Sequence, residues 1–217
     1  MCFDQKQTWE GQFGNEYVKR NLPDLWRVTE AEKVFKSIFS VGTLLQCTTI
    51  LEVGCGTGVN LLALSQIIPD NKVKLFGVDV NKKALDEAKN QFDHMNADCQ
   101  LYYQDLDSFY RLHEDETFDL VMTCGVLIHV HPNDLLAFME KIHTLAERYI
   151  LCMEYFSHKP VAECYQGKEN LLWKRDFGAL YLGEFPNLEC KSYGFLWQHE
   201  YSHFDNINWW LFKKEEK

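Results

Sequence analysis

The sequence predicts an α/β fold, a doubly wound and mostly parallel sheet of seven strands with an antiparallel C-terminal edge. Short apolar segments alternate with amphipathic segments from residue 48 onward. The turns that follow the apolar segments are rich in glycine and polar residues, and they fall where an open parallel sheet places its ligand site. The last two apolar segments are joined by a short connection, which suits an antiparallel pair.

The elements are expected in the order strand, helix, strand. Strands are predicted at Thr48–Val53, Val73–Asp79, Gln100–Tyr103, Phe118–Thr123 and Tyr149–Glu154, with the antiparallel pair at Leu188–Trp197 and Asn208–Lys213. Helices are predicted at Thr29–Leu45, from Val59 to the stop at Pro69, from an Asn81 cap to Phe92, and at Leu135–Ala146. The stretch Ser108–Thr117 is expected to be a solvated loop, and residues 1–28 show little periodicity.

The length and net charge of the chain limit the number of domains and the kinds of binding partner. A chain of 217 residues without repeats or linkers is expected to form one domain. The 22 basic and 32 acidic residues give a net charge of −10. This excess of acid disfavours nucleic acids and anionic membrane surfaces as partners, because both require clustered Lys and Arg.

Cysteine usage and the N-terminus suggest a compartment. The eight cysteines are scattered without a CxxC pair, so they are read as reduced thiols. No basic stretch precedes an apolar core near residue 1, and no apolar run is long enough to span a membrane. We therefore expect a cytoplasmic protein; the oligomeric state is not predicted.

The strongest chemical signal is the turn Glu52-Val53-Gly54-Cys55-Gly56-Thr57-Gly58, between a strand and a helix. Its glycines let the chain pass close to a ligand, and the helix start supplies free amides. A dinucleotide site would require glycine at position 59, where this chain has Val59. The spacing instead resembles the first motif of class I S-adenosylmethionine-dependent methyltransferases, in which this loop holds the methionine part of the cofactor. The alternative is an ordinary glycine-rich turn.

Two acidic residues extend the resemblance. Asp79 ends the second strand, where a carboxylate can accept hydrogen bonds from both ribose hydroxyls; the alternative, a helix cap, is weaker because Asn81 suits that role. Asp105 stands where methyltransferases of this class hydrogen-bond the adenine amino group, with a solvated loop aspartate as the alternative. The cofactor-binding residues expected in this part of the chain are Glu52, Gly54, Cys55, Gly56, Gly58, Asn60, Asp79, Val80, Asp105, Leu106, Cys124, Gly125 and Val126.

Two histidines follow the fourth strand. His129 and His131 are candidate general bases, because histidine titrates near neutral pH. A histidine at a strand end is as often a structural group. A metal site is not expected, since no further ligand follows at a suitable spacing. Methyl transfer is an in-line displacement that an amine acceptor can undergo without a base, whereas a sugar hydroxyl usually requires a proton acceptor.

Motifs along nearly the whole chain resemble one narrower family. The N-terminal pattern W-x-G-x-F-G-x-x-Y-x-x-R-N spans residues 9–21, and Gly125-Val126-Leu127-Ile128-His129 follows the fourth strand. The C-terminal part contains Glu154-Tyr155-Phe156, Tyr165-x-Gly167, Leu172-Trp173-Lys174-Arg175-Asp176-Phe177 and Tyr193-Gly194-Phe195. Together they resemble the pseudaminic acid biosynthesis-associated methylases, a bacterial family found with nonulosonic-sugar and surface-polysaccharide genes.

The resemblance implies methylation of a sugar or sugar derivative, with S-adenosylmethionine as cofactor. Tyr17 and Asn21, four residues apart, are expected to share a helix face over the carboxylate end of the cofactor, with Arg20 as a further candidate. Lys174 and Arg175 are expected to bind an acceptor carboxylate or phosphate, unless they are a solvated basic pair. Tyr155, Tyr165, Trp173 and Trp197 are candidates to stack on a sugar ring, although aromatics at such spacings are equally common in cores.

These expectations divide the chain into three parts: an N-terminal helical cap at 1–47, a cofactor-binding core at 48–152, and an acceptor side with the C-terminal strands at 153–217. Two alternatives remain open. The enzyme could methylate another small metabolite or a protein, or the chain could bind S-adenosylmethionine without turnover. The intact glycine turn and acidic residues speak against loss of turnover.

Overall fold

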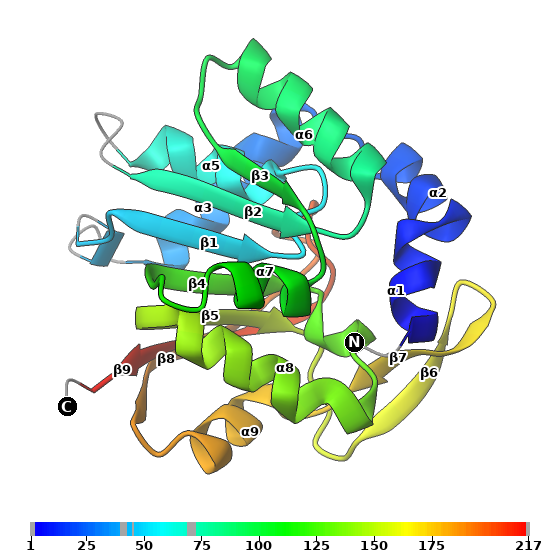
Figure 1. The fold of residues 1–217 in the computed structure, drawn as a ribbon, viewed down its shortest axis with the longest axis vertical. Helices are drawn as coiled ribbons and strands as arrows, with labels where there is room; N and C mark the ends of the chain where they lie inside the picture. Colours follow the sequence, from blue (N-terminus) through cyan, green and yellow to red (C-terminus); the bar gives the residue numbers. More distant parts are fainter. Residues whose placement is uncertain (1–2, 40–42, 45, 69–72, 216–217) are drawn as a thin grey trace.

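The computed structural model describes residues 3–39, 43–44, 46–68 and 73–215. Its centre is a seven-stranded sheet in the order β3-β2-β1-β4-β5-β9-β8 (Figure 1). The strands are β1 (Thr49–Val53), β2 (Lys74–Asp79), β3 (Gln100–Tyr103), β4 (Phe118–Cys124), β5 (Ala146–Glu154), β8 (Leu188–Leu196) and β9 (Ile207–Lys214).

The strand directions confirm the predicted fold class. The strands from β3 to β5 in this order pair in parallel. The β9 strand pairs antiparallel with both β5 and β8, which makes the C-terminal edge. The order reverses between β1 and β4, and at such a switch point the carboxyl ends of the strands leave a crevice for a ligand.

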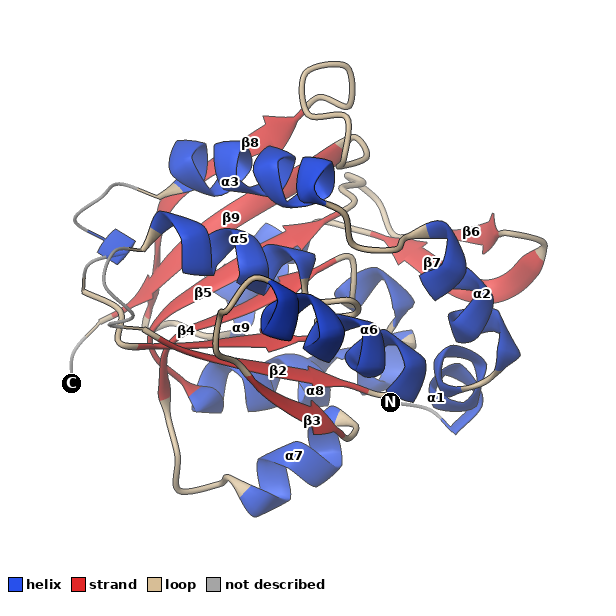
Figure 2. Cartoon of the chain, turned by 90° about the horizontal axis from the view of Figure 1, so that it is seen from above, coloured by secondary structure: helices blue, strands red, loops and turns tan. Residues whose placement is uncertain are grey.

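Helices cover both faces of the sheet (Figure 2). One face carries α3 (Leu25–Ile38), α5 (Val59–Ile67) and α6 (Lys82–His94), and the other carries α7 (Leu106–Leu112), α8 (Pro132–Leu145) and α9 (Phe177–Glu184). Successive residues of β4 alternate between the two cores: Leu120 and Met122 pack with the first group and Val121 with the second. This strand is therefore apolar on both sides, as a central parallel strand must be.

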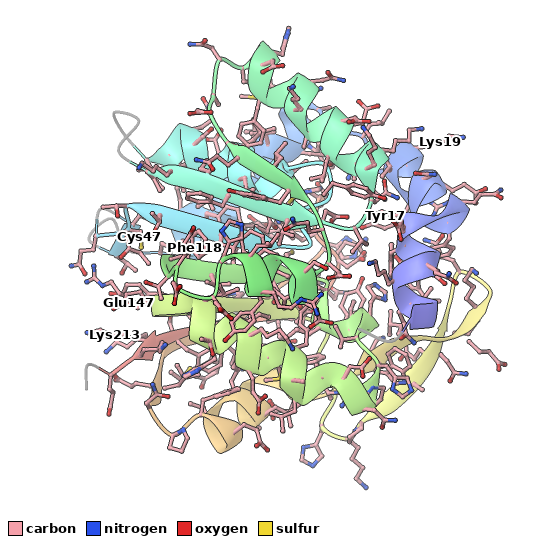
Figure 3. All side chains as sticks on the ribbon, in the orientation of Figure 1. Tyr17, Lys19, Cys47, Phe118, Glu147 and Lys213 are labelled. Atoms are coloured by element: carbon pink, nitrogen blue, oxygen red, sulfur yellow. The ribbon has the colours of Figure 1, made fainter. Side chains whose placement is uncertain are left out.

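A cover stands at the carboxyl ends of the parallel strands. It consists of α1 (Phe3–Glu10), α2 (Gln12–Arg20) and the hairpin β6 (Val161–Tyr165)–β7 (Lys168–Lys174), which lie beyond the arrowheads in Figure 1. Lys6 of α1 binds the Asp105 carboxylate, with Nζ and Oδ2 2.5 Å apart. On α2, Tyr17 faces the sheet while Lys19 points outward (Figure 3).

Some elements differ from the sequence prediction. The expected loop at Ser108–Thr117 is wrong in its first half, because α7 begins after the Asp105 cap and buries Phe109 fully. The α3 helix starts at Leu25 rather than Thr29, since the Asp24 side chain accepts a hydrogen bond from the Arg27 amide at 2.8 Å.

The same helix ends at Ile38, whereas the prediction ran to Leu45. Leu45 and the predicted stop at Pro69 lie outside the described residues, as does Cys2. The other seven cysteines are free thiols. Within the described part of the chain, no helix combines the length and the apolar character needed to cross a membrane.

The turn into α5 provides a test of the fold. Gly58 has a φ of +76°, and a Cβ atom there would lie 3.1 Å from the Ala88 Cβ and from the Phe92 ring. We expect Gly58→Ala to lower the free energy of unfolding by about 1–2 kcal/mol, because an L side chain is strained in this backbone region. Urea unfolding measures the change.

Gly183→Ala is the matched control. Gly183 lies in α9, and a Cβ atom there meets nothing within 4 Å. Alanine favours a helix, so this variant should be as stable as the parent or slightly more stable. Equal stability changes in the two variants would contradict the conformational role of Gly58.

Candidate functional site

A cavity of about 400 Å³ opens at the carboxyl ends of the parallel strands, beneath the cover. Most residues predicted to bind cofactor or acceptor line it. They are Tyr17, Asn21, Glu52, Gly54, Cys55, Gly56, Asn60, Asp79, Val80, Asp105, Leu106, Cys124, Gly125, Val126, His129, Tyr155 and Tyr165.

The glycine turn forms the floor of this cavity. Gly54 and Gly56 have φ angles of +73° and +53°, which favour glycine. A Cβ atom on Gly56 would meet nothing within 4 Å, so the backbone there faces open space. The Gly56 amide donates to Asp79 Oδ2 at 2.8 Å, and the Asn81 amide donates to Asp79 Oδ1 at 2.7 Å. Each carboxylate oxygen keeps a lone pair for a further donor.

Glu52, at the end of β1, carries an unsatisfied oxygen. The residue is 1% exposed, and Oε1 accepts a hydrogen bond from Asn60 Nδ2 at 2.7 Å, whereas Oε2 is buried without a partner. Burial raises the pKa of Glu52 to about 8; the Asn60 hydrogen bond opposes this rise and the Asp79 charge adds to it. A buried unpaired carboxylate oxygen is costly unless a donor or cation reaches it.

Asp105 lines the cavity between the end of β3 and the start of α7. Its Oδ1 accepts from the Ser108 amide at 2.7 Å, and its Oδ2 accepts from Lys6 Nζ. Burial disfavours the charged form, but these hydrogen bonds outweigh it and lower the pKa of Asp105 to about 2. Asp105 is therefore an anion that caps α7 and anchors α1, and its contact with adenine stays a prediction.

A buried carboxylate shapes the loop after β4. Glu154, fully buried at the end of β5, accepts hydrogen bonds from the amides of Val126, Leu127 and Ile128 at 3.0–3.3 Å. These contacts fix the short helix η2 (Leu127–His129), which follows the cavity wall formed by Cys124 and Gly125. The position of His129 thus depends on Glu154.

His129 lies in a closed aromatic setting. Its Nδ1 donates to the Leu171 carbonyl at 2.6 Å, and its ring centroid is 4.7 Å from that of Trp9 and 5.0 Å from that of Tyr165. Burial lowers the pKa of His129 to about 4, so the ring is neutral at pH 7. Its role as a base stays a prediction, and the hydrogen bond to Leu171 fits the structural alternative as well.

His131 and Trp173 do not line the cavity, so the structure does not bring them together with the other predicted site residues. His131 caps α8 by accepting a hydrogen bond from the Asn133 amide at 3.2 Å. Its ring packs edge-on against Trp173, with centroids 5.4 Å apart. Trp173 is 7% exposed. Both residues pack near η2, and their roles as a base and a stacking surface stay predictions.

Four other predicted residues also lie outside the cavity lining. Lys174 pairs with Glu163 across the β6–β7 hairpin, with Nζ and Oε2 2.7 Å apart, and Arg175 follows the same strand. Arg20 is exposed and donates to the Gln166 side chain at the hairpin turn. Gly58 serves the turn into α5. Lys174 Nζ also lies 5.4 Å from the ring centroid of Tyr155, which lines the cavity. Binding of an acceptor by Lys174 and Arg175, and of the cofactor by Arg20, stays a prediction.

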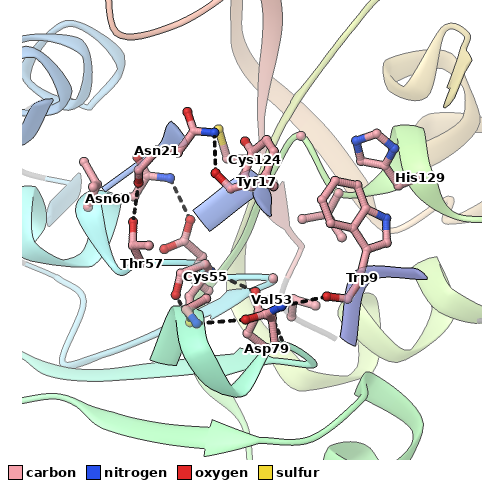
Figure 4. Close-up of a pocket in the computed structure, with 18 of the residues that line it drawn as sticks. Trp9, Tyr17, Asn21, Val53, Cys55, Thr57, Asn60, Asp79, Cys124 and His129 are labelled. Atoms are coloured by element: carbon pink, nitrogen blue, oxygen red, sulfur yellow. Dashed lines mark hydrogen bonds between the residues drawn. The ribbon is translucent and has the colours of Figure 1, made fainter. Parts of the chain in front are cut away.

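Several lining residues were missed by the sequence prediction. Trp9 belongs to the quoted N-terminal pattern, which could have indicated it. Arg27 lies on α3, where its Nη1 donates to the Asn21 side chain at 3.3 Å and lies 3.5 Å from His203 Nδ1. The loop before β9 contributes His203 and Asp205, and no pattern in the sequence marks that loop. Figure 4 shows Trp9 beside His129, across the cavity from Asn60 and Thr57.

Comparison with known families identifies the core. Residues 50–148, from β1 into β5, match the family described as the methyltransferase domain. These residues are similar to a methyltransferase domain, and they make up slightly less than half of the chain. The match includes the glycine turn, Asp79, Asp105 and the loop after β4, and such a domain uses S-adenosylmethionine.

Solved methyltransferases share the fold. The magnesium protoporphyrin IX methyltransferase of Synechocystis PCC 6803, with bound S-adenosylmethionine, superposes with a TM-score of 0.71 at 17% identity, covering 99% of both chains. The 1,6-didemethyltoxoflavin-N1-methyltransferase of Burkholderia thailandensis gives 0.66 at 12% identity, covering 94% of this chain and 86% of that one. At these identities the likeness shows the class I fold alone.

A curated relative is the tRNA N(3)-methylcytidine methyltransferase of Drosophila melanogaster. It is 25% identical over 137 residues, which cover 61% of this chain and 41% of the relative. The chain therefore spans less than half the length of the curated relative that it matches.

The residues that are present fit S-adenosylmethionine. The unpaired Glu52 oxygen suits the cationic amino group of the cofactor, the free lone pairs of Asp79 suit the ribose hydroxyls, and the open backbone at Gly56 lets the ligand approach closely. Tyr17 and Asn21 line the same cavity from α2 and its C-terminal end.

Binding of the cofactor should be coupled to release of a proton from the Glu52 carboxyl group. With a pKa of about 8, Glu52 is mostly protonated at pH 7 in the free enzyme. An ammonium group beside it favours the carboxylate, so binding of S-adenosylmethionine at pH 7 should release about one proton. Calorimetry in buffers with different ionisation enthalpies measures the number of protons.

Glu52→Gln should remove most of this proton release and weaken binding. Glu140→Gln, an exposed substitution on α8, is the control and should behave as the parent. If the parent and Glu52→Gln release equal numbers of protons, Glu52 is not the titrating group.

Proposed function

We propose that the enzyme methylates a sugar or sugar derivative, of the nonulosonic type or from surface-polysaccharide synthesis, with S-adenosylmethionine as methyl donor. The observation that carries this proposal is the composition of the cavity beyond the glycine turn. There aromatic rings and hydrogen-bonding side chains line one space: Trp9, Tyr17, Tyr155, Tyr165, His203 and Asp205.

That combination suits a polyhydroxylated ring. The C–H face of a sugar packs on aromatic side chains, and its hydroxyl groups exchange hydrogen bonds with polar ones. Trp9 packs against Tyr165, with centroids 6.4 Å apart, so the two rings form a continuous wall. The motif resemblance at residues 9–21 and 172–177 supports the same substrate class.

The net charge of the chain and the charges in the cavity lining disfavour RNA as the substrate. The tRNA methyltransferase relative must bind a polyanion, whereas this chain has a net charge of −10. Among the described residues that line the cavity, Glu52, Asp79, Asp105 and Asp205 face one guanidinium, that of Arg27. A small acceptor is thus favoured over a nucleic acid.

The chain's own residues align the acceptor and exclude water. When bound, the cofactor supplies a methyl group on a positively charged sulfur. The α1 and α2 helices and the hairpin β6–β7 close over the strand ends and hold Trp9, Tyr17 and Tyr165 above the cavity. Alignment in such a site contributes a large part of the rate of a displacement reaction.

A methyl-transfer assay tests the proposal. The purified protein is incubated with labelled S-adenosylmethionine and a panel of nucleotide sugars, nonulosonic acids, small natural-product scaffolds, peptides and tRNA. Mass spectrometry should find a gain of one methyl group on a sugar. Methylation confined to a non-sugar acceptor would overturn the proposed substrate class. If the protein does not bind S-adenosylmethionine, the assignment as a methyltransferase is overturned.

The aromatic wall gives a second prediction. Trp9→Leu should raise the KM for the sugar about tenfold, because a buried stacking surface of this size is worth roughly 1 kcal/mol or more. The affinity for S-adenosylmethionine, measured by calorimetry, should change much less. Trp197→Leu is the control, since Trp197 is 56% exposed and does not line the cavity. An unchanged KM in Trp9→Leu would remove Trp9 from the acceptor site.

A further inference from the structure

Asp205 and Tyr155 form a hydrogen-bonded pair in the cavity. The Tyr155 hydroxyl donates to Oδ2 of Asp205, and both residues line the cavity. Tyr155 directly follows β5 and Asp205 precedes β9, and these strands pair up to Glu154 and Asn208. The pair is therefore fixed at the same sheet edge as the loop after β4.

The second oxygen of Asp205 is free. In the part of the chain that the structure describes, the hydrogen bond from Tyr155 is the only one that Asp205 makes. The side chain is also exposed rather than buried. Oδ1 can therefore accept a hydrogen bond or a proton from a ligand, while Tyr155 holds the carboxylate in place through Oδ2.

Asp205 lines the same cavity as Cys124, at the end of β4, and Tyr17. Burial is the main reason why the pKa values of Tyr17 and Cys124 are raised, and the Asp205 charge adds to the rise in both. The Asp205 carboxylate therefore acts electrostatically on both side chains.

The other titratable groups at the cavity are less suited to receive a proton. The carboxylates of Asp79 and Asp105 already accept hydrogen bonds on both oxygens. Burial lowers the pKa values of His129 and His203 to about 4. His129 also has Nδ1 committed to a carbonyl, and His203 lies beside the Arg27 guanidinium.

Glu52 is the remaining acid at the cavity. It lies at the end of β1, where Oε1 accepts a hydrogen bond from Asn60, and its other oxygen suits the amino group of the cofactor. Among the described carboxylates that line the cavity with Trp9 and Tyr165, Asp205 is therefore the one left with an oxygen for the acceptor.

We propose that the acceptor atom is a hydroxyl oxygen and that Asp205 takes its proton, with Tyr155 as the positioning residue. This inference rests on the proposed function and names the reacting group. The methyl group leaves sulfur for the acceptor oxygen, sulfur keeps the electron pair of the broken bond, and the hydroxyl proton moves to Oδ1 of Asp205. Solvent then takes the proton from the exposed carboxyl group.

Two substitutions test the pair on whichever hydroxyl compound the panel identifies. Asp205→Asn keeps the shape but removes the proton acceptor, so kcat at pH 7 should fall by at least about 100-fold. Tyr155→Phe removes the hydrogen bond that orients the carboxylate, and kcat should fall about tenfold. Calorimetry should find the affinity for S-adenosylmethionine, and for the acceptor in the S-adenosylhomocysteine complex, within about twofold of the parent.

The control variants lie outside the site. Asp86→Asn changes an exposed aspartate of α6 that pairs with Lys82, and Tyr193→Phe changes a tyrosine of β8 that is 75% exposed. Both should retain the parent kcat. Any loss in Asp205→Asn is then specific to its position rather than to the loss of a charge.

Two further measurements separate a proton acceptor from a structural role. In Asp205→Asn, hydroxide must remove the proton, so log kcat should rise by about one per pH unit between about pH 7 and 9, a slope absent from the parent. Added formate should restore part of the activity of Asp205→Gly, because a free carboxylate can enter the space left by the side chain.

The outcomes distinguish this inference from the proposed function. If a sugar hydroxyl is methylated and Asp205→Asn keeps the parent kcat, the inference fails and the proposed function stands. If the enzyme methylates a hydroxyl group of a compound that is not a sugar, and this activity depends on Asp205, the inference stands and the proposed sugar substrate is wrong. The inference is overturned if the enzyme methylates only amines, or if it methylates no compound with a hydroxyl group. It is also overturned if kcat falls in His129→Gln but does not fall in Asp205→Asn.

Discussion

The hydrogen bonds that Asp79 accepts from the amides of Gly56 and Asn81 join the end of β2 to the glycine turn after β1. They hold the turn in left-handed backbone conformations that favour glycine, and so keep the strand ends open instead of filled by a side chain. The same contacts fix the start of α6, where Asn81 also binds the Trp9 carbonyl at 2.8 Å. One carboxylate thereby links the floor of the cavity to its cover, and the geometry of the whole site depends on it.

The cofactor side was predictable because its chemistry is local in the sequence. Each signal lies within a few residues of the backbone that it controls. The signals are the glycine spacing from Glu52 to Gly58, the acid at the end of the second strand, and the apolar strand before Cys124. Parallel strands then bring these short signals to one edge of the sheet without further information. The predicted fold class was confirmed for the same reason, since each strand carries its own pattern of burial.

The cavity wall that contains Asp205 was only partly predictable, because its residues meet through tertiary packing; Tyr155 and Tyr165 were expected there, whereas Asp205 was not. Asp205 reaches Tyr155 across the β5–β9 pairing, 50 residues apart in the chain, and nothing near either residue indicates the contact. Trp173 and His131 were predicted at the site, but they pack on each other outside the cavity lining. The α7 helix was missed because the sequence around it is polar, and the fully buried ring of Phe109 is too weak a signal on its own to indicate a helix. Aromatic and histidine residues serve cores and sites equally well, so their identity alone does not decide between the two.

The balance of charge in the cavity explains how one site can hold the donor and release the product. Among the described residues of the lining, the carboxylates outnumber the guanidinium of Arg27. Burial raises the pKa values of both Glu52 and Asp79, so each charged form is held at a cost. A cationic ligand offsets that cost, and S-adenosylmethionine carries a positive sulfonium that is lost once the methyl group has left. The product therefore meets a weaker attraction than the donor in the same cavity. The buried acids thus favour binding of the donor over binding of the product.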